Sequence, residues 1–121
     1  MGINILVADD AEVILRGIKM MLRGNEEIQI VGEASSFSEA IGKTGELRPD
    51  VLVIDLHLAK GRSAELKSAV NGTKILAISF ACDEEAEDLA RDIGAVKFLD
   101  KMALAQEMIP TILQLASSSN L

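Results

Sequence analysis

Val51-Leu52-Val53-Ile54-Asp55-Leu56 is a short apolar run interrupted by one carboxylate, and it follows directly on Pro49-Asp50. Proline and aspartate favour a turn, so the run begins a new element. An unbroken apolar run between turn signals predicts a strand covered on both faces, as in a parallel sheet. Open parallel sheets bind ligands beyond the carboxyl ends of their strands, where Asp55 stands. Asp55 is therefore a candidate site residue, although it could simply end the strand or cap the next turn.

The composition indicates one acidic, aliphatic domain. The chain has 121 residues, of which 49% are hydrophobic and 2% aromatic, so its core should consist of Ile, Leu, Val, Ala and Met. A chain of this length can bury roughly two-thirds of its unfolded surface as a single domain. We assign residues 1–116 to that domain and the serine-rich residues 117–121 to a tail or linker stub. The net charge of −7 argues against nucleic acid as a partner of this chain alone, but suits a divalent cation or a basic partner.

Cysteine content and hydropathy bear on the cellular compartment. The single cysteine, Cys82, excludes an internal disulfide and suits a reducing cytosol. We expect a small buried or half-buried thiol there rather than a catalytic one, because His57 is its only candidate imidazole partner. No apolar run approaches the roughly 20 residues of a membrane helix, and no signal-peptide pattern precedes the first strand. These features predict a cytoplasmic protein with no membrane contact.

Apolar periodicity predicts five strands that alternate with five helices. The expected strands cover residues 3–8, 28–31, 51–55, 74–79 and 96–99. The expected helices include residues 14–22, a segment that opens with a capping box at Ser36, residues 61–70, residues 83–93, and a last segment over 104–116 that Pro110 should kink or reset. This alternation predicts an α/β fold, with a doubly wound, five-stranded parallel sheet and right-handed crossovers. The common order of such strands is 2-1-3-4-5.

Polar side chains gather where these strands end. Asp9 and Asp10 follow the first strand, Asp55 ends the third, Ser79 ends the fourth, and Lys101 lies just beyond the fifth. Neighbouring carboxylates repel one another unless a cation lies between them, and hard oxygen ligands suit Mg²⁺. A lysine and a hydroxyl on the opposite rim could hold the oxygens of a phosphoryl group. Each residue alone could be a cap, a strand end or a solvated charge, but together they indicate a site for metal and phosphate.

This constellation resembles the receiver domain of bacterial two-component response regulators, the CheY-like family with its flavodoxin-like fold. The resemblance covers the chain from Ile3 to about Ala116. Its motifs are the acid pair at 9–10, the segment 49–55, Ser79, and Phe98-Leu99-Asp100-Lys101. The segment 30–35, Ile-Val-Gly-Glu-Ala-Ser, is similar to the NarL/FixJ subgroup, whose members usually carry a DNA-binding helix-turn-helix domain after the receiver.

The resemblance implies a phosphorylation switch. Asp55 would accept a phosphoryl group from a sensor histidine kinase or a phosphotransfer protein. Lys101 would pair with one phosphoryl oxygen, and Ser79 would move in to hydrogen-bond another. Phe98 would then turn inward, which makes a two-state element biased by one charged group. Such a domain modifies itself and is not a turnover enzyme.

The resemblance also implies a metal and partners. Asp10 and Asp55 would bind Mg²⁺, or alternatively Mn²⁺, directly, Asp9 would bind it through water, and the backbone carbonyl of His57 would complete the protein ligands. Output would pass to a partner protein or an effector domain, and a weak homodimer is a further expected assembly.

Three positions depart from the family pattern. Ala59 replaces a usual proline in a loop that looks short, and Met102 replaces another proline, so we expect an ordinary trans bond before it. Phe80 replaces a small residue beside the phosphoryl site. We expect this ring to pack in the core or at a hinge, the alternative being that it restricts access to the crevice. His57 occupies a position that tunes the phosphoryl lifetime, and both His57 and Phe80 are therefore modulating candidates.

Two other functions compete with a phosphoacceptor. One is a degenerate receiver that acts as a protein-interaction module without phosphorylation. The other is a small Mg²⁺ phosphatase with an aspartate nucleophile, similar to the haloacid dehalogenase-like enzymes. Those enzymes place a second aspartate two residues after the nucleophile, where this chain has His57, so we rank this function last.

Overall fold

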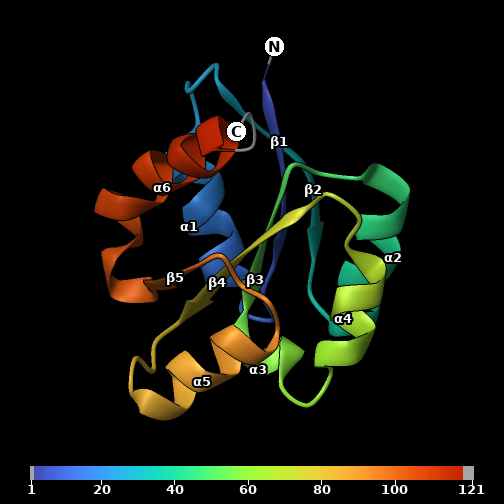
Figure 1. Cartoon of the computed structure of the whole chain (residues 1–121). Helices are drawn as coiled ribbons and strands as arrows, with labels where there is room; N and C mark the ends of the chain where they lie inside the picture. The colour runs from blue at the N-terminus through green and yellow to red at the C-terminus, as the bar shows by residue number, and fades with distance from the viewer. Residues whose placement is uncertain (1, 119–121) are drawn as a thin grey trace.

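The computed structural model describes residues 2–118 as a five-stranded sheet between two layers of helices (Figure 1). The strands are β1 (Ile3–Ala8), β2 (Ile28–Ala34), β3 (Val51–Asp55), β4 (Lys74–Ser79) and β5 (Lys97–Asp100). The helices are α1 (Glu12–Leu22), α2 (Phe37–Leu47), α3 (Leu56–Ala59), α4 (Ser63–Ala69), α5 (Glu84–Asp92), the 3₁₀ helix η1 (Lys101–Ala103) and α6 (Leu104–Ser118). All strand pairs are parallel, in the order β2-β1-β3-β4-β5, so the predicted fold class is confirmed.

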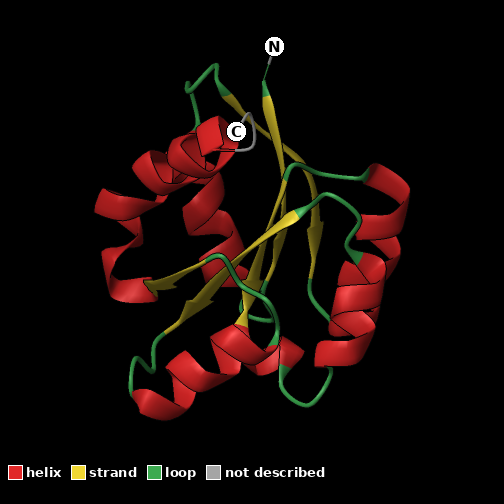
Figure 2. Cartoon of the chain, viewed as in Figure 1, coloured by secondary structure: helices red, strands yellow, loops and turns green. Residues whose placement is uncertain are grey.

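Helices lie on both faces of the sheet (Figure 2), and each face packs an aliphatic core beneath them, as the doubly wound fold requires. Helices α1 and α6 cover one face, and α2, α3, α4 and α5 cover the other. Every residue of β3 is buried, which confirms the strand predicted from the apolar run at 51–55. The carboxylate of Asp55 is therefore held at the centre of the sheet by a strand that packs on both sides.

Three elements differ from the sequence prediction. The chain forms α3 directly after Asp55, where a loop was expected, so the described residues contain six α-helices rather than five. Strand β2 continues to Ala34, and its register with β1 shifts between Ile5 and Leu6, which marks a bulge. Helix α6 runs through Pro110 without ending and includes Ser118, the last described residue of the expected tail, while 119–121 lie outside the described residues.

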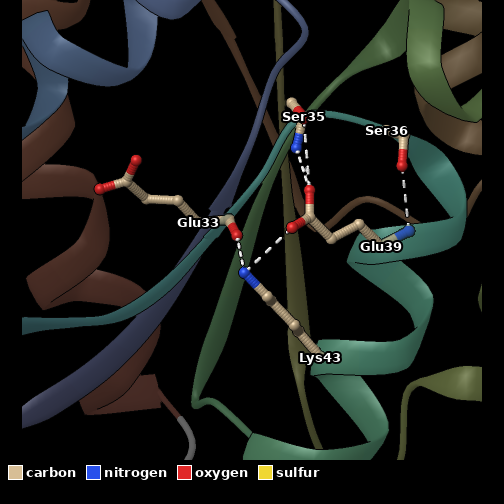
Figure 3. A network of polar contacts seen from close by, with 5 residues as sticks. All are labelled: Glu33, Ser35, Ser36, Glu39 and Lys43. Carbon is tan, nitrogen blue, oxygen red and sulfur yellow. Dashed lines mark hydrogen bonds and ion pairs between the residues drawn. The ribbon is translucent and has the colours of Figure 1, made fainter.

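The capping box predicted at the start of α2 is present with one change (Figure 3). The Glu39 amide donates to Ser36 Oγ at 3.1 Å, but the Glu39 carboxylate accepts from the Ser35 amide, at 2.7 Å, rather than from the cap residue itself. Lys43 donates to the Glu33 carbonyl at 2.5 Å and lies 3.2 Å from the Glu39 carboxylate. This network fixes the turn from β2 into α2.

No helix among the described residues is both long and apolar enough to cross a bilayer.

Candidate functional site

The register of the parallel strands brings the predicted site residues to one edge of the sheet. Ala8 pairs with Ile54, so Asp9 lies beside Asp55 at the ends of neighbouring strands. On the other side, Ser79 pairs with Asp100, and Lys101 follows immediately. The structure therefore brings together all five side chains that the sequence places at strand ends.

Lys101 contacts the carboxylates directly, although the sequence predicts it on the opposite rim of the site. Its ammonium is 2.6 Å from Asp9 Oδ2 and 3.0 Å from Asp55 Oδ1. The side chains of these three residues are only 6%, 0% and 4% exposed, respectively. Lys101 is thus the internal counterion of two buried carboxylates.

The carboxylates of Asp9, Asp10 and Asp55 form a candidate cation site. Each offers an oxygen within 4.8 Å of the others. Asp9 Oδ1 accepts from the Ala11 amide at 2.8 Å, and the buried Asp9 Oδ2 is paired with the Lys101 ammonium. Asp10 is exposed, so one side of the cluster is open to solvent. Three carboxylates with a hydrated side fit Mg²⁺.

Burial and charge act in opposite directions on Asp55 and Lys101. Burial raises the pKa of Asp55, and the charge of Asp9 adds to this, while Lys101 only partly offsets them. For Lys101, burial alone would lower the pKa, but its contacts with Asp9 and Asp55 raise it above the usual lysine value. The ammonium is therefore held firmly in its charged form beside a carboxylate that is costly to ionise.

Ser79 lies at the carboxyl end of β4, and Phe98 lies in the neighbouring strand β5. Ser79 is 3% exposed at the end of β4, and its hydroxyl accepts from the Ala81 amide at 3.0 Å. The half-buried ring of Phe98 packs against the core beneath α2, α3, α4 and α5. The switch assigned to these residues stays a prediction.

Phe80 and Cys82 contradict their expected burial. Phe80 is 60% exposed rather than packed in the core, and the Lys101 ammonium lies 5.1 Å from the centroid of its ring. Cys82 is exposed, and partial desolvation of its thiol together with the nearby charge of Asp100 raises the pKa of that thiol. Both residues lie in the loop between β4 and α5.

The segment after Asp55 is helical rather than an open loop. His57 is exposed in α3, while Ala59 is buried, and the bond before Met102 is trans, as expected. A cleft of about 240 Å³ lies between α3 and α5, with His57 and Ser79 in its lining. Sequence reasoning missed this cleft because it depends on a helix too short to produce a periodic signal. The metal role assigned to the His57 carbonyl stays a prediction.

The family described as response regulator receiver domain matches residues 5–113. The chain belongs to this family. It is therefore a receiver domain of two-component signal transduction, and such domains are generally not turnover enzymes.

A curated relative agrees with this assignment. The response regulator protein VraR of Staphylococcus aureus is 28% identical over 116 residues, which cover 93% of this chain and 56% of VraR. This receiver thus spans about half the length of the curated relatives it matches.

Two solved structures share the fold. The signal receiver domain of NarL from Mycobacterium tuberculosis superposes with a TM-score of 0.85 at 24% identity, covering 96% of this chain and 97% of that one. The response regulator domain of CheB from Thermotoga maritima gives 0.81 at 24% identity, with 100% and 98% covered. The similarity to VraR agrees with the NarL/FixJ subgroup predicted from residues 30–35.

Proposed function

We propose that this receiver domain accepts a phosphoryl group on Asp55 in a reaction that depends on Mg²⁺. One observation carries the proposal. The buried carboxylate of Asp55 lies 3.0 Å from the Lys101 ammonium and within 4.8 Å of the carboxylates of Asp9 and Asp10. A nucleophile, a cation for phosphoryl oxygens and a cluster of metal ligands therefore share one edge of the sheet.

The donor in this proposal is a phosphohistidine on a sensor histidine kinase or a phosphotransfer protein. A carboxylate oxygen of Asp55 attacks the phosphorus in line, so a P–O bond forms as the P–N bond breaks. The electron pair of the P–N bond remains on the imidazole, whose other nitrogen is protonated, and the imidazole leaves as a neutral group. The product is an acyl phosphate on Asp55.

The other site residues stabilise the charge that this transfer brings. Lys101 turns from Asp55 Oδ1 toward a phosphoryl oxygen, which is a short movement because both oxygens belong to the same group after transfer. The Ser79 hydroxyl gives up the contact with the Ala81 amide and donates to a second phosphoryl oxygen. Phe98 follows into the space that Ser79 leaves, and His57 and Phe80 modulate the rates.

Asp9, Asp10 and Asp55 are the side chains that hold the Mg²⁺, or Mn²⁺ in its place, with the His57 carbonyl as a further ligand. When bound, the ion neutralises phosphoryl charge and orients the donor. The carboxylates of Asp9, Asp10 and Asp55, which converge within 4.8 Å with Asp10 exposed to solvent, support this assignment. Lys101 would then bind a phosphoryl oxygen, and the three carboxylates would bind the metal.

The chain belongs to the receiver family and covers only part of its relatives. These two facts support proposals about the output partner, the cellular location and the assembly of the protein. The chain covers 56% of VraR, so we infer that an effector domain or a separate output protein receives the signal. Residues 1–116 act as the receiver, whose last helix α6 continues through Ser118. The net charge of −7 makes DNA binding by the receiver itself unfavourable. A cytoplasmic location and a weak homodimer complete the proposal.

A direct mass measurement tests the proposed chemistry. The protein is incubated with Mg²⁺ and phosphoramidate or acetyl phosphate, and its intact mass is measured beside that of Asp55→Asn. We expect one phosphoryl adduct on the wild type and none on the variant. A wild type without an adduct would instead support the degenerate interaction module. Steady phosphate release from a monoester substrate would support the phosphatase.

A further inference from the structure

Phe80 is the one exposed aromatic side chain of this protein. The chain has three phenylalanines and no tryptophan or tyrosine. Phe37 is 5% exposed and Phe98 packs against the second core, whereas Phe80 is 60% exposed. Burying an aromatic ring is strongly favourable, so a ring left mostly in solvent at a functional edge requires a local reason.

Strand register explains why this ring meets Lys101. Ser79 of β4 pairs with Asp100 of β5, so the next residues of the two strands, Phe80 and Lys101, lie side by side. Both backbones are anchored at this point. The Ala81 amide donates to Ser79 Oγ at 3.0 Å, and the Met102 amide donates to the Asp100 carboxylate at 2.9 Å. The parallel register of β4 and β5 thus makes the ring and the ammonium neighbours.

The contact has the geometry of a cation–π interaction. The ammonium of Lys101 lies over the ring, 5.1 Å from its centroid, and the Lys101 side chain is only 6% exposed. The negative face of the ring attracts a cation, and the attraction is larger when the cation is shielded from water. Asp9 and Asp55 hold the same ammonium on another side. Lys101 is therefore held between two carboxylates and an aromatic face.

We propose that Phe80 is a positioning residue for Lys101, which it holds through the face of its ring at the mouth of the acidic cluster. This inference rests on the proposed function, because the positioned ammonium is the group that meets the phosphoryl oxygen. When the phosphoryl group enters, Lys101 leaves its contacts with the free carboxylates. The ring does not change during transfer, so it keeps the ammonium directed at Asp55.

A steric role for Phe80 makes a different prediction from a positioning role. If the ring only shields the site, a leucine of comparable bulk leaves the phosphorylation rate unchanged, and Phe80→Ala increases it by opening the site. If the face of the ring holds Lys101, Phe80→Leu slows phosphorylation and Phe80→Tyr, which keeps the ring, does not. Position 80 is exposed, so neither substitution disturbs the core.

The first test is spectroscopic and needs no phosphorylation. Lysine labelled with ¹³C at the ε carbon is incorporated, and the Lys101 signal is assigned by its loss in Lys101→Arg. An ammonium over a ring face places its ε protons in the shielding region of the ring. We expect an upfield shift of the Lys101 ε protons in the wild type and in Phe80→Tyr, and its loss in Phe80→Leu. A Lys101 signal that is the same in wild type and Phe80→Leu overturns the proposal.

The second test measures the initial rate of phosphorylation by phosphoramidate at saturating Mg²⁺. We expect Phe80→Leu to be slower than the wild type by about threefold to tenfold, the range for one cation–π contact at a partly shielded site, and Phe80→Tyr to stay within about twofold. Equal rates for Phe80→Leu and the wild type overturn the proposal. A wild type that acquires no phosphoryl group refutes the proposed function instead, and the spectroscopic result then stands by itself.

Discussion

The ammonium of Lys101 lies 2.6 Å from Asp9 Oδ2, at the ends of two strands that are not neighbours in the sheet. The same ammonium reaches Asp55 on β3, the strand between β1 and β4, so a lysine that follows the edge strand β5 contacts carboxylates on the two central strands β1 and β3. The charge of Lys101 therefore stabilises the fold, in addition to its candidate role in catalysis.

Loss of this charge should destabilise the domain. We expect Lys101→Met, which keeps the aliphatic bulk, to lower the free energy of unfolding by about 3 kcal/mol, because two buried carboxylates lose their counterion. Lys97→Met removes the same charge from an exposed position of β5 and should change stability by less than about 0.5 kcal/mol. Urea denaturation near neutral pH measures both. Equal effects of the two substitutions would show that the counterion contributes nothing specific.

Removal of the Asp55 charge should have the opposite effect. The pKa of Asp55 is raised in the folded state, chiefly by burial. Its contribution to stability is therefore fully present below the unfolded pKa and is lost as the pH rises through the folded pKa. We expect Asp55→Asn to raise the free energy of unfolding near neutral pH by on the order of 1 kcal/mol, with the gain shrinking as the pH falls. Urea denaturation over a pH series measures the gain. Glu26→Gln, at an exposed loop position, is the matched control and should give no such pH-dependent gain.

Mg²⁺ should stabilise the domain through its acid cluster. An ion that binds only the folded state adds about 2.7 kcal/mol at a concentration one hundred times its Kd. Asp10 is the exposed member of the cluster, so Asp10→Asn should preserve the fold and weaken Mg²⁺ binding by roughly tenfold or more. Thermal melts over a Mg²⁺ series measure the affinity. Asp92→Asn, at the far end of α5, should respond to Mg²⁺ like the wild type, and an equal response from Asp10→Asn would remove Asp10 from the site.

The sequence was sufficient to predict the strands and the residues at their ends. Every apolar run between turn signals became a strand, and parallel register then fixed which carboxyl ends meet. Asp9, Asp55, Ser79 and Lys101 could be placed together because their positions depend on strand order alone. Strand order does not determine the direction of a long side chain, so the contact of Lys101 with Asp9 could not be predicted.

Other features escaped prediction for local reasons. Helix α3 has four residues, Leu56–Ala59, which is too few for a helical period to be recognised. The bulge in β2 leaves no mark in an alternating pattern that is already weak over residues 28–34. The ring of Phe80 is expected in the core because aromatic side chains mainly supply buried area, but it lies at the surface, 5.1 Å from the Lys101 ammonium.

The network around Glu39 should make stability depend on pH (Figure 3). The hydrogen bond from the Ser35 amide and the contact with Lys43 lower the pKa of Glu39 below its usual value. A lowered folded pKa contributes stability above the unfolded pKa and loses it as the pH falls through the folded pKa. We expect Glu39→Gln to be less stable than the wild type near neutral pH and equal to it in acid. Glu46→Gln on the same helix is the control in urea denaturation. A difference that persists unchanged in acid would mean that the ionised carboxylate is not the cause.

Gly32 in β2 and Gly42 in α2 should respond in opposite directions to the same substitution. A Cβ at position 32 would lie 2.9 Å from Leu47 Cδ1 and 3.1 Å from Leu6 Cδ1, and Leu6 is fully buried. We expect Gly32→Ala to lower the free energy of unfolding by about 1 kcal/mol, because Leu6 cannot move away easily even though the half-exposed Leu47 can. A Cβ at position 42 would meet nothing within 4 Å, so Gly42→Ala should raise stability by about 0.5–1 kcal/mol through helix propensity. Thermal melts of both variants measure the signs, and a Gly32→Ala protein as stable as Gly42→Ala would mean that the packing between β2 and β1 is loose.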